Sequence, residues 1–288
     1  MRTSYDCVPC AIGHCLKSVR MATDDETVHE RVLREALALW QQADLAQSPP
    51  ALAQQVHRLI RRITGVDDPY LAVKNEYNAF ALRMYPELRQ RVEQSTDPFD
   101  TAVRLAVAAN VIDFGVNAGV EQTAVQETIL RALTDPLDAG IVQRLREAIA
   151  RATEILYLGD NAGEIVFDRL LIERVPREKV TYVVRGRAII NDALMEDAEI
   201  AGLTDLVAVI DNGSDGPGTI LDTCSESFRR RFEQADLIVA KGQGNFESLS
   251  DTEKNVFFLL RPKCAVLSRY LGCEMGRLVV VQSGNGMR

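Results

Sequence analysis

Short β-rich runs alternate with helical stretches along the second half of this 288-residue chain, and this alternation limits the fold more than any other feature. We expect strands at residues 155–158, 180–184, 206–210, 237–240, 265–267 and 278–281, with one connecting helix at 220–234. Strands separated by helices usually pair in parallel, and the helices then cover both faces of the sheet. The pattern therefore predicts an α/β fold with a Rossmann-like three-layer α/β/α arrangement and a mainly parallel sheet.

The first half has the periodicity of helices. From residue 23 to about residue 151, apolar residues recur every three or four positions, and turn residues divide the pattern into segments. We expect helices that begin near Asp24 or Asp25, after Ser48, at Asp68 and at Asp97, with Pro86 restarting the third of them. We divide the chain accordingly into an all-helical domain, residues 1–150, and an α/β domain, residues 151–288.

Composition excludes several classes of protein. The formal net charge of -8 argues against a broad nucleic-acid surface. No stretch approaches the roughly 18 apolar residues of a membrane span, and the N-terminus lacks a signal-peptide pattern. We expect a cytoplasmic protein with no nucleic-acid and no membrane partner; the sequence leaves the oligomeric state open.

Oxygen-bearing side chains follow the first two expected strands. Asp160, Asn161 and Glu164 lie in a polar turn directly after residues 155–158, and Asp192 follows the second strand. If these strands are neighbours, Asp160, Asn161 and Asp192 meet at the carboxyl edge of the sheet, where ligands bind in α/β folds. Carboxylate and amide oxygens suit a hard divalent cation. These three residues are therefore candidate metal ligands, although Asp192 at the start of a helix also fits an N-cap.

Several side chains near the same edge are candidates for binding a phosphorylated substrate, with Glu164 of the polar turn among them. The second strand ends in Arg185, and Arg187 follows; the two are either surface residues or groups that balance the charge of a phosphate. Ser214 lies in a glycine-rich loop after the third strand. Lys241 follows the fourth strand and is suited to contacting a phosphoryl oxygen. The glycines after it let backbone and ligand approach closely. The remaining candidates of this loop are Gly242 and Asn245.

Two pairs of polar residues interrupt the helical half. Asn110 and Asp113 lie in an otherwise apolar segment, where they either cap a helix end or reach toward a cleft. Lys74 and Asn78 share one face of the preceding helix, and we expect both to be solvated.

Six cysteines do not form a disulfide framework in a chain of this size, so we expect reduced thiols or metal ligands. Cys7 and Cys10 form a C-x2-C pair near His14 and Cys15. If the chain termini meet in space, Cys264 and Cys273 are the candidates to complete a structural metal site with Cys7 and Cys10. Buried structural thiols and a redox pair are the two alternatives.

Four ordered motifs, GDNAGEIVFD, VRGRAIINDA, NGSDGPGT and AKGQGNFES, resemble the signature of the DUF89 family, the metal-dependent damage-control phosphatases. The early C-x-P-C motif resembles the cysteine-bearing microbial subgroup of that family. The resemblance implies a helical domain packed on a Rossmann-like domain, and hydrolysis of phosphate esters with magnesium, manganese, cobalt or nickel. It also implies metal ligation by Asp160, Asn161 and Asp192, phosphate binding by Lys241, and a substrate cleft lined by Asn110 and Asp113.

The sequence thus predicts a metal-dependent phosphatase for small phosphate esters, such as sugar phosphates or damaged phosphometabolites, with Asp160, Asp192 and Lys241 as its catalytic residues. The nucleophile is either a water molecule or one of the two aspartates. A non-catalytic sugar-phosphate or nucleotide sensor is the alternative. A methyltransferase is a weaker one, because GDNAGE is not the G-x-G-x-x-G turn of dinucleotide-binding proteins.

Overall fold

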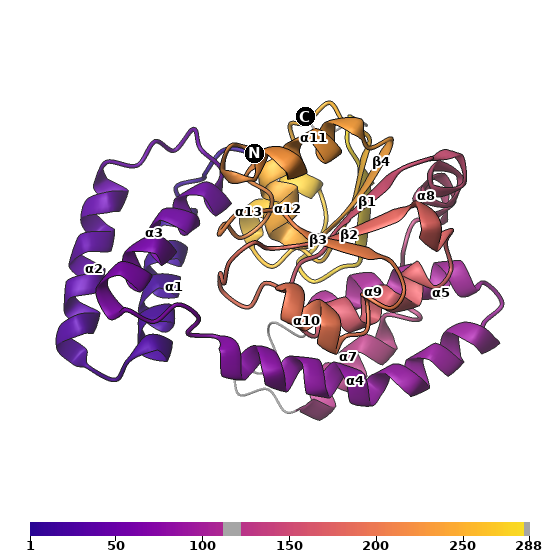
Figure 1. Ribbon diagram of the computed structural model, residues 1–288, viewed down its shortest axis with the longest axis horizontal. Helices are drawn as coiled ribbons and strands as arrows, with labels where there is room; N and C mark the ends of the chain where they lie inside the picture. Colours follow the sequence, from indigo (N-terminus) through magenta and orange to yellow (C-terminus); the bar gives the residue numbers. More distant parts are fainter. Residues whose placement is uncertain (112–121, 285–288) are drawn as a thin grey trace.

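The computed structural model describes residues 1–111 and 122–284 (Figure 1). The helices of the first half are α1 (Cys7–Ala22), α2 (Glu26–Gln41), α3 (Pro49–Thr64), α4 (Leu71–Gln94), α5 (Pro98–Ala108), the 3-10 turn η1 (Ala109–Val111), α7 (Gln122–Arg131) and α8 (Ala139–Arg151). The second half contains β1 (Ile155–Leu158), α9 (Glu164–Ile172), η2 (Arg177–Lys179), β2 (Val180–Val184), α10 (Met195–Ile200), β3 (Ala208–Asp211), η3 (Leu221–Thr223), α11 (Glu226–Gln234), β4 (Leu237–Lys241), α12 (Gly242–Leu249), β5 (Val256–Leu260), α13 (Ala265–Leu271) and β6 (Val279–Gln282).

The strands form one sheet in the order β3-β2-β1-β4-β5-β6, and every pairing is parallel except that of β5 with β6. From β1 the chain adds β2 and β3 on one side of the sheet and then β4 and β5 on the other, so the strand order has a switch point between β1 and β4. Ligands bind at such a switch point in open α/β sheets. The predicted α/β fold with a mainly parallel sheet is confirmed.

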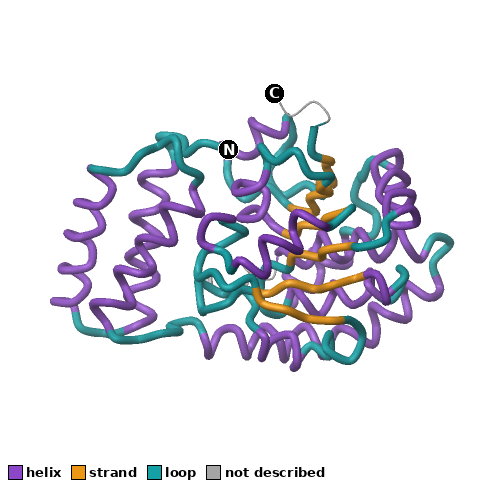
Figure 2. The backbone as a smooth tube through the Cα atoms, turned by 45° about the horizontal axis from the view of Figure 1, so that its top comes forward, coloured by secondary structure: helices purple, strands orange, loops and turns teal. Residues whose placement is uncertain are grey.

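Alternating side chains of β1 show how the sheet is covered on both faces. Ile155 and Tyr157 pack into one hydrophobic core with α4, α5, α8 and α9, whereas Leu156 and Leu158 pack into a second core with α11, α12 and α13. Figure 2 shows helices on both sides of the strands. Because both faces are buried, the strand reads as an unbroken apolar run.

The first three helices stand apart as a bundle at the left of Figure 1, with a core of their own that includes Val32, Trp40 and Leu59. Helices α4, α5 and α8 instead share a core with β1 and α9. The division of the chain at residue 150 stays a prediction. The described residues include no helix that is long and apolar enough to span a membrane.

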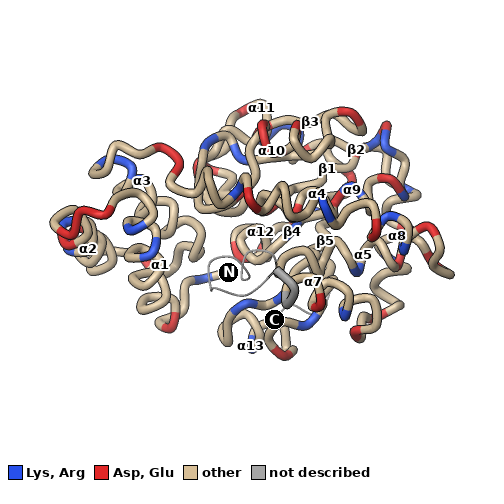
Figure 3. Tube along the Cα trace, turned by 90° about the horizontal axis from the view of Figure 1, so that it is seen from below, with Lys and Arg blue, Asp and Glu red and all other residues tan. Residues whose placement is uncertain are grey.

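Local signals explain several helix boundaries. Asp25 caps α2 by accepting a hydrogen bond from the Thr27 backbone N–H (2.8 Å), and Asp97 caps α5 in the same way. Gly65 ends α3 in the left-handed conformation, with φ of 72°. Outside the caps, the surfaces of the helices carry interspersed acidic and basic residues, as Figure 3 shows for α4, α5 and α8.

Three expectations were wrong in detail. The fifth strand is Val256–Leu260, and the expected strand at 265–267 is the start of α13, where the Cys264 thiol accepts a hydrogen bond from the Leu267 N–H. The helix expected at 220–234 begins only at Glu226, because Ser225 caps it there. Pro86 does not restart a helix, since α4 continues through it.

Candidate metal and phosphate site

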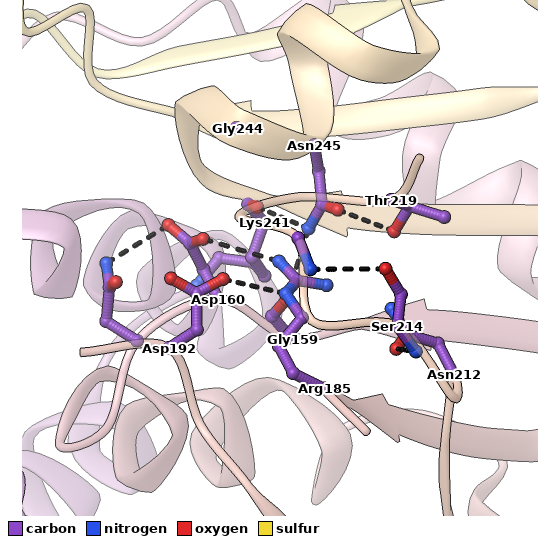
Figure 4. A network of polar contacts seen from close by, with 12 residues as sticks. Gly159, Asp160, Arg185, Asp192, Asn212, Ser214, Thr219, Lys241, Gly244 and Asn245 are labelled. Atoms are coloured by element: carbon purple, nitrogen blue, oxygen red, sulfur yellow. Dashed lines mark hydrogen bonds and ion pairs between the residues drawn. The ribbon is translucent and has the colours of Figure 1, made fainter. Parts of the chain in front are cut away.

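The candidate site lies at the carboxyl ends of β1, β2 and β4. Asp160 and Asn161 follow β1, Asp192 lies in the connection after β2, and Lys241 is the last residue of β4. Figure 4 shows Asp160, Arg185, Asp192 and Lys241 drawn together from these three connections. The strand order places this group at the switch point between β1 and β4.

Backbone contacts hold the first two loops against each other. Asn161 and Asp192 form an isolated antiparallel β-bridge. The Ala193 N–H donates to the Asp160 carbonyl (2.8 Å), and the Ala162 N–H donates to the Asn191 carbonyl (2.9 Å). The fold therefore brings together the three residues that the sequence suggested as metal ligands; their ligand role stays a prediction.

Arg185 lies between the two carboxylates. Its Nε donates to Asp192 Oδ2 (2.7 Å), and its Nη2 lies 3.7 Å from Asp160 Oδ1. The side chain is 2% exposed, and within the described part of the chain neither terminal nitrogen makes a hydrogen bond. Two buried donors without acceptors are costly unless a ligand supplies oxygen atoms.

Burial and nearby negative charge shift the pKa of Asp160. They raise the pKa of its carboxyl well above the usual range, through loss of solvent and through Glu164 and Asp192. In this buried network, the carboxylates of Asp160, Glu164, Asp168 and Asp192 outnumber the basic groups of Arg185 and Lys241. A divalent cation bound beside Asp160 and Asp192 would balance this charge, and the available oxygen donors suit such an ion.

Asn110 reaches into this network from the turn η1, which follows α5. Its Nδ2 donates to Asp160 Oδ2 (3.1 Å) and to Glu164 Oε2 (2.8 Å). Its Oδ1 is buried and has no hydrogen-bond partner among residues 1–111 and 122–284. Of the two roles considered for Asn110, the side chain takes the one directed toward the site. Asp113 lies outside the described residues.

Lys241 lies beneath the site rather than in an open cleft. Its Nζ is fully buried and donates to Glu164 Oε1 (2.7 Å) and Asp168 Oδ1 (2.6 Å). Burial alone would lower the pKa of Lys241, but Asp168 and Glu164 raise it above the usual value. Its predicted contact with phosphate stays a prediction. Asp168 was missed by sequence reasoning, although its spacing of four from Glu164 on an apolar helix could have identified it.

Gly242 is required by the close approach of its backbone to Asp160. It has a φ of 77°, and a Cβ at this position would lie 1.7 Å from Asp160 Oδ2. No residue with a side chain fits here without displacing the carboxylate. The loop after β4 therefore depends on this glycine.

Ser214, Thr219 and Asn245 brace the loops around the site. The Ser214 hydroxyl bonds with Thr223 Oγ1 (2.6 Å), and Asn245 accepts from Thr219 Oγ1 (2.8 Å). Asn245 Nδ2 also donates to the carbonyls of Gly159 and Lys241. Figure 4 shows Asn245 above Arg185 and Ser214 to its right. The substrate-binding roles of Ser214, Asn245, Gly242 and Glu164 stay predictions.

Sequence reasoning missed a second set of contacts, made by α3. Gln54 Nε2 donates to Asp215 Oδ1 (2.8 Å), and Arg58 and Arg61 both pair with the same carboxylate. Arg61 also donates to the Ala188 carbonyl. The α1–α3 bundle is thus fastened to the loops that follow β2 and β3.

The expectation that Lys74 and Asn78 are solvated was wrong. Both are buried, at 2% and 1% exposed. Asn78 accepts from the Gly163 N–H (2.7 Å) and donates to Asp197 Oδ1 (2.7 Å), and Lys74 pairs with Asp68 (2.8 Å). Helix α4 thus supports the turn that carries Asp160 and Asn161.

The cysteines from the two ends of the chain lie within electrostatic range of one another. Cys7, Cys10 and Cys264 are free thiols that interact electrostatically, and burial raises the pKa of both Cys7 and Cys10. Throughout the described chain, no three Cys, His, Asp or Glu side chains are grouped so as to hold a metal ion. A structural metal at Cys7, Cys10 and Cys264 stays a prediction.

Comparison with known proteins gives a consistent result. A family model described as the damage-control phosphatase ARMT1-like domain matches residues 3–279. A damage-control phosphatase of Archaeoglobus fulgidus is 37% identical over 97% of this chain and 98% of its own length. One of Pyrococcus horikoshii is 34% identical over 98% of this chain and 99% of its own length.

A crystal structure of a DUF89 family protein from Pyrococcus horikoshii matches with a TM-score of 0.85 and 33% identity, covering 98% of this chain and 99% of that one. The resemblance that the four sequence motifs carry is therefore confirmed. The chain belongs to the damage-control phosphatase ARMT1-like domain family.

Proposed function

We propose that this protein is a metal-dependent phosphatase that hydrolyses small phosphate esters, such as sugar phosphates or damaged phosphometabolites. The observation that carries the proposal is the convergence of Asp160, Asn161 and Asp192 at the switch point of the sheet, fixed by the bridge between Asn161 and Asp192. The names of the relatives from Archaeoglobus and Pyrococcus support phosphatase activity.

We infer that Asp160, Asn161 and Asp192 hold one divalent cation through side-chain oxygens. When bound, magnesium, manganese, cobalt or nickel would supply a Lewis acid that offsets charge on the phosphoryl group. The excess of buried carboxylates over basic groups in the network supports this assignment.

Arg185 is the group we assign to the phosphoryl oxygens. Its Nε is held by Asp192, so the guanidinium has a fixed orientation and its two terminal nitrogens remain available. A planar fork of this kind matches two phosphate oxygens. Helix α12 begins at Gly242 against Asp160, which adds the positive end of a helix dipole at the same place.

Two nucleophiles fit the site: a water molecule, and the carboxylate of Asp160 or Asp192. The carboxylate route transfers the phosphoryl group to aspartate and then requires hydrolysis of the acyl phosphate. Acid quenching during turnover of a radiolabelled ester distinguishes them, because only the carboxylate route leaves label on the protein.

A phosphate-release assay tests the proposal. Protein treated with a chelator is expected to lose hydrolysis of a generic phosphate ester, and added manganese or cobalt is expected to restore it. Undiminished activity after chelation would refute the metal role. Tight binding of phosphorylated metabolites without phosphate release would favour the sensor.

We also infer a cytoplasmic location, because all six cysteines are unpaired thiols.

A further inference from the structure

Asn161 is held through its amide nitrogen by two carboxylates. Its Nδ2 donates to Asp160 Oδ2 (3.1 Å) and to Glu164 Oε2 (3.1 Å). A side-chain amide has its donor and acceptor on opposite branches, so the two carboxylates direct the nitrogen inward and leave Oδ1 on the other side. A ligand role requires Oδ1 rather than Nδ2 to face the ion, because only the oxygen binds a hard cation.

Glu164 is itself held by a buried basic group. It is fully buried, and its Oε1 accepts from Lys241 Nζ (2.7 Å) while its Oε2 faces Asn161. A buried carboxylate without a partner would be costly, so the ion pair with Lys241 stabilises Glu164 and fixes its position.

Lys241 is held in turn by Asp168, which three donors fix in place. Asp168 Oδ1 accepts from Lys241 Nζ (2.6 Å) and from the Tyr157 hydroxyl (2.9 Å), and Oδ2 accepts from the Tyr182 hydroxyl (2.7 Å). The rings of Tyr157 and Tyr182, on the neighbouring strands β1 and β2, stack with their centroids 5.2 Å apart. The loops that carry Asn161 and Asp192 follow these same strands, so one rigid platform supports both.

We propose that Asp168, Lys241 and Glu164 form a positioning relay that orients the Asn161 amide for metal binding, and that Lys241 works in this relay instead of contacting phosphate. The proposal rests on the proposed function, since it assumes that Asn161 is a ligand. It assigns a role to Asp168, Tyr157 and Tyr182, which the phosphatase mechanism otherwise leaves without one.

Manganese affinity of the protein without substrate is the first measurement, by calorimetry on protein freed of metal. Asp168→Asn, Lys241→Met and Glu164→Gln are each expected to weaken manganese binding about 10- to 100-fold, the usual effect of losing a group that orients a ligand. At saturating manganese, inhibition by inorganic phosphate should stay within about twofold of the wild type, because the relay does not touch phosphate.

A double variant separates position from charge. Glu164→Gln with Lys241→Met removes one negative and one positive charge, so the net charge of the network is unchanged. The relay predicts that the double variant still binds manganese at least about 10-fold more weakly. Affinity restored to the wild-type value would show that charge alone matters and would overturn the proposal.

Milder variants test the relay even if the charge-changing variants fail to fold. Tyr182→Phe removes one hydrogen bond to Asp168 without altering charge, and a loss of manganese affinity of about threefold to tenfold is expected. Tyr70→Phe is the matched control, since it also loses a buried hydroxyl contact, to Ser18 Oγ (2.8 Å). It should bind manganese like the wild type.

Three further outcomes would overturn the relay: wild-type affinity in Asp168→Asn and Tyr182→Phe, loss of phosphate inhibition in Lys241→Met at saturating manganese, or no manganese binding by the wild type. Absence of chelator-sensitive phosphate release from the wild type would instead overturn the proposed function, and the manganese titrations would still decide the relay.

Discussion

Asn161 and Asp192 pair with each other across a single antiparallel β-bridge, although they follow different strands of a parallel sheet. The bridge fixes the backbone of two candidate ligands before any ion binds. Ligands that are already in position need little rearrangement when the ion binds, so the free-energy cost of ordering them is small. This favours a single well-defined ion position.

Replacing Gly242 by alanine is expected to displace Asp160. The new Cβ would meet Asp160 Oδ2 at 1.7 Å, and the residue would also have to adopt a φ of 77°. Phosphate release should fall by about 100-fold or more, because a shift of about 1 Å in a catalytic group has effects of that size.

Gly65→Ala is the matched control for this variant. Gly65 has a similar φ of 72°, but a Cβ there meets no atom within 4 Å. The left-handed backbone conformation should lower the free energy of unfolding of this variant in urea by roughly 1 to 2 kcal/mol. Its activity should stay that of the wild type. Equal activity losses in the two variants would contradict the proposed role of the space at Gly242.

Replacing Arg185 by lysine is expected to weaken productive binding of phosphate esters. Lysine keeps the charge but cannot hold Asp192 and present two further donors at the same time. We expect kcat/KM on manganese-loaded protein to fall about 10- to 100-fold, as for the loss of a hydrogen bond to a charged group. Arg187→Lys is the control, because Arg187 is 65% exposed and should change kcat/KM by less than twofold.

The contacts of Asp215 predict a dependence of stability on pH. Burial acts to raise the pKa of Asp215, but hydrogen bonds and charge from Arg58 and Arg61 lower it to about 2. The folded-state pKa is therefore below the unfolded value of about 3.9, so the stabilisation is complete above that value and declines as the pH falls toward 2.

Urea unfolding of the wild type and of Asp215→Asn measures this effect. The difference in unfolding free energy should be about 1 to 2 kcal/mol at pH 7 and should shrink at pH 3. Asp67→Asn, at an exposed position paired with Arg187, is the control and should cost less than about 0.5 kcal/mol. A difference for Asp215→Asn that grows on acidification would have the wrong sign for this account.

The sequence was sufficient to predict β1, β2 and the turn at Asp160 because their signals are local. An apolar run followed by Gly159 and a polar turn identifies a buried strand and its carboxyl end from a few neighbouring residues. The strand Val256–Leu260 was missed although it is wholly buried, since a short apolar run without alternation does not distinguish strand from helix.

The side chains that brace the site were not predictable in this way. Lys74 appeared solvated because its burial and its distant partner Asp197 both depend on the packing of α4 on the α/β domain. The carboxylate of Asp168 likewise has its basic partner, Lys241, at the end of a strand that is distant in the sequence. Contacts between residues far apart in the chain determine burial and pairing, and local patterns do not contain them.

Diffraction from crystals grown with manganese tests the central claim most directly. The account predicts one anomalous difference peak per chain, within about 2.0 to 2.5 Å of side-chain oxygens from Asp160, Asn161 and Asp192, and no peak at this place in crystals of Asp192→Asn. A peak bound by other residues, or no peak in active crystals, would contradict it.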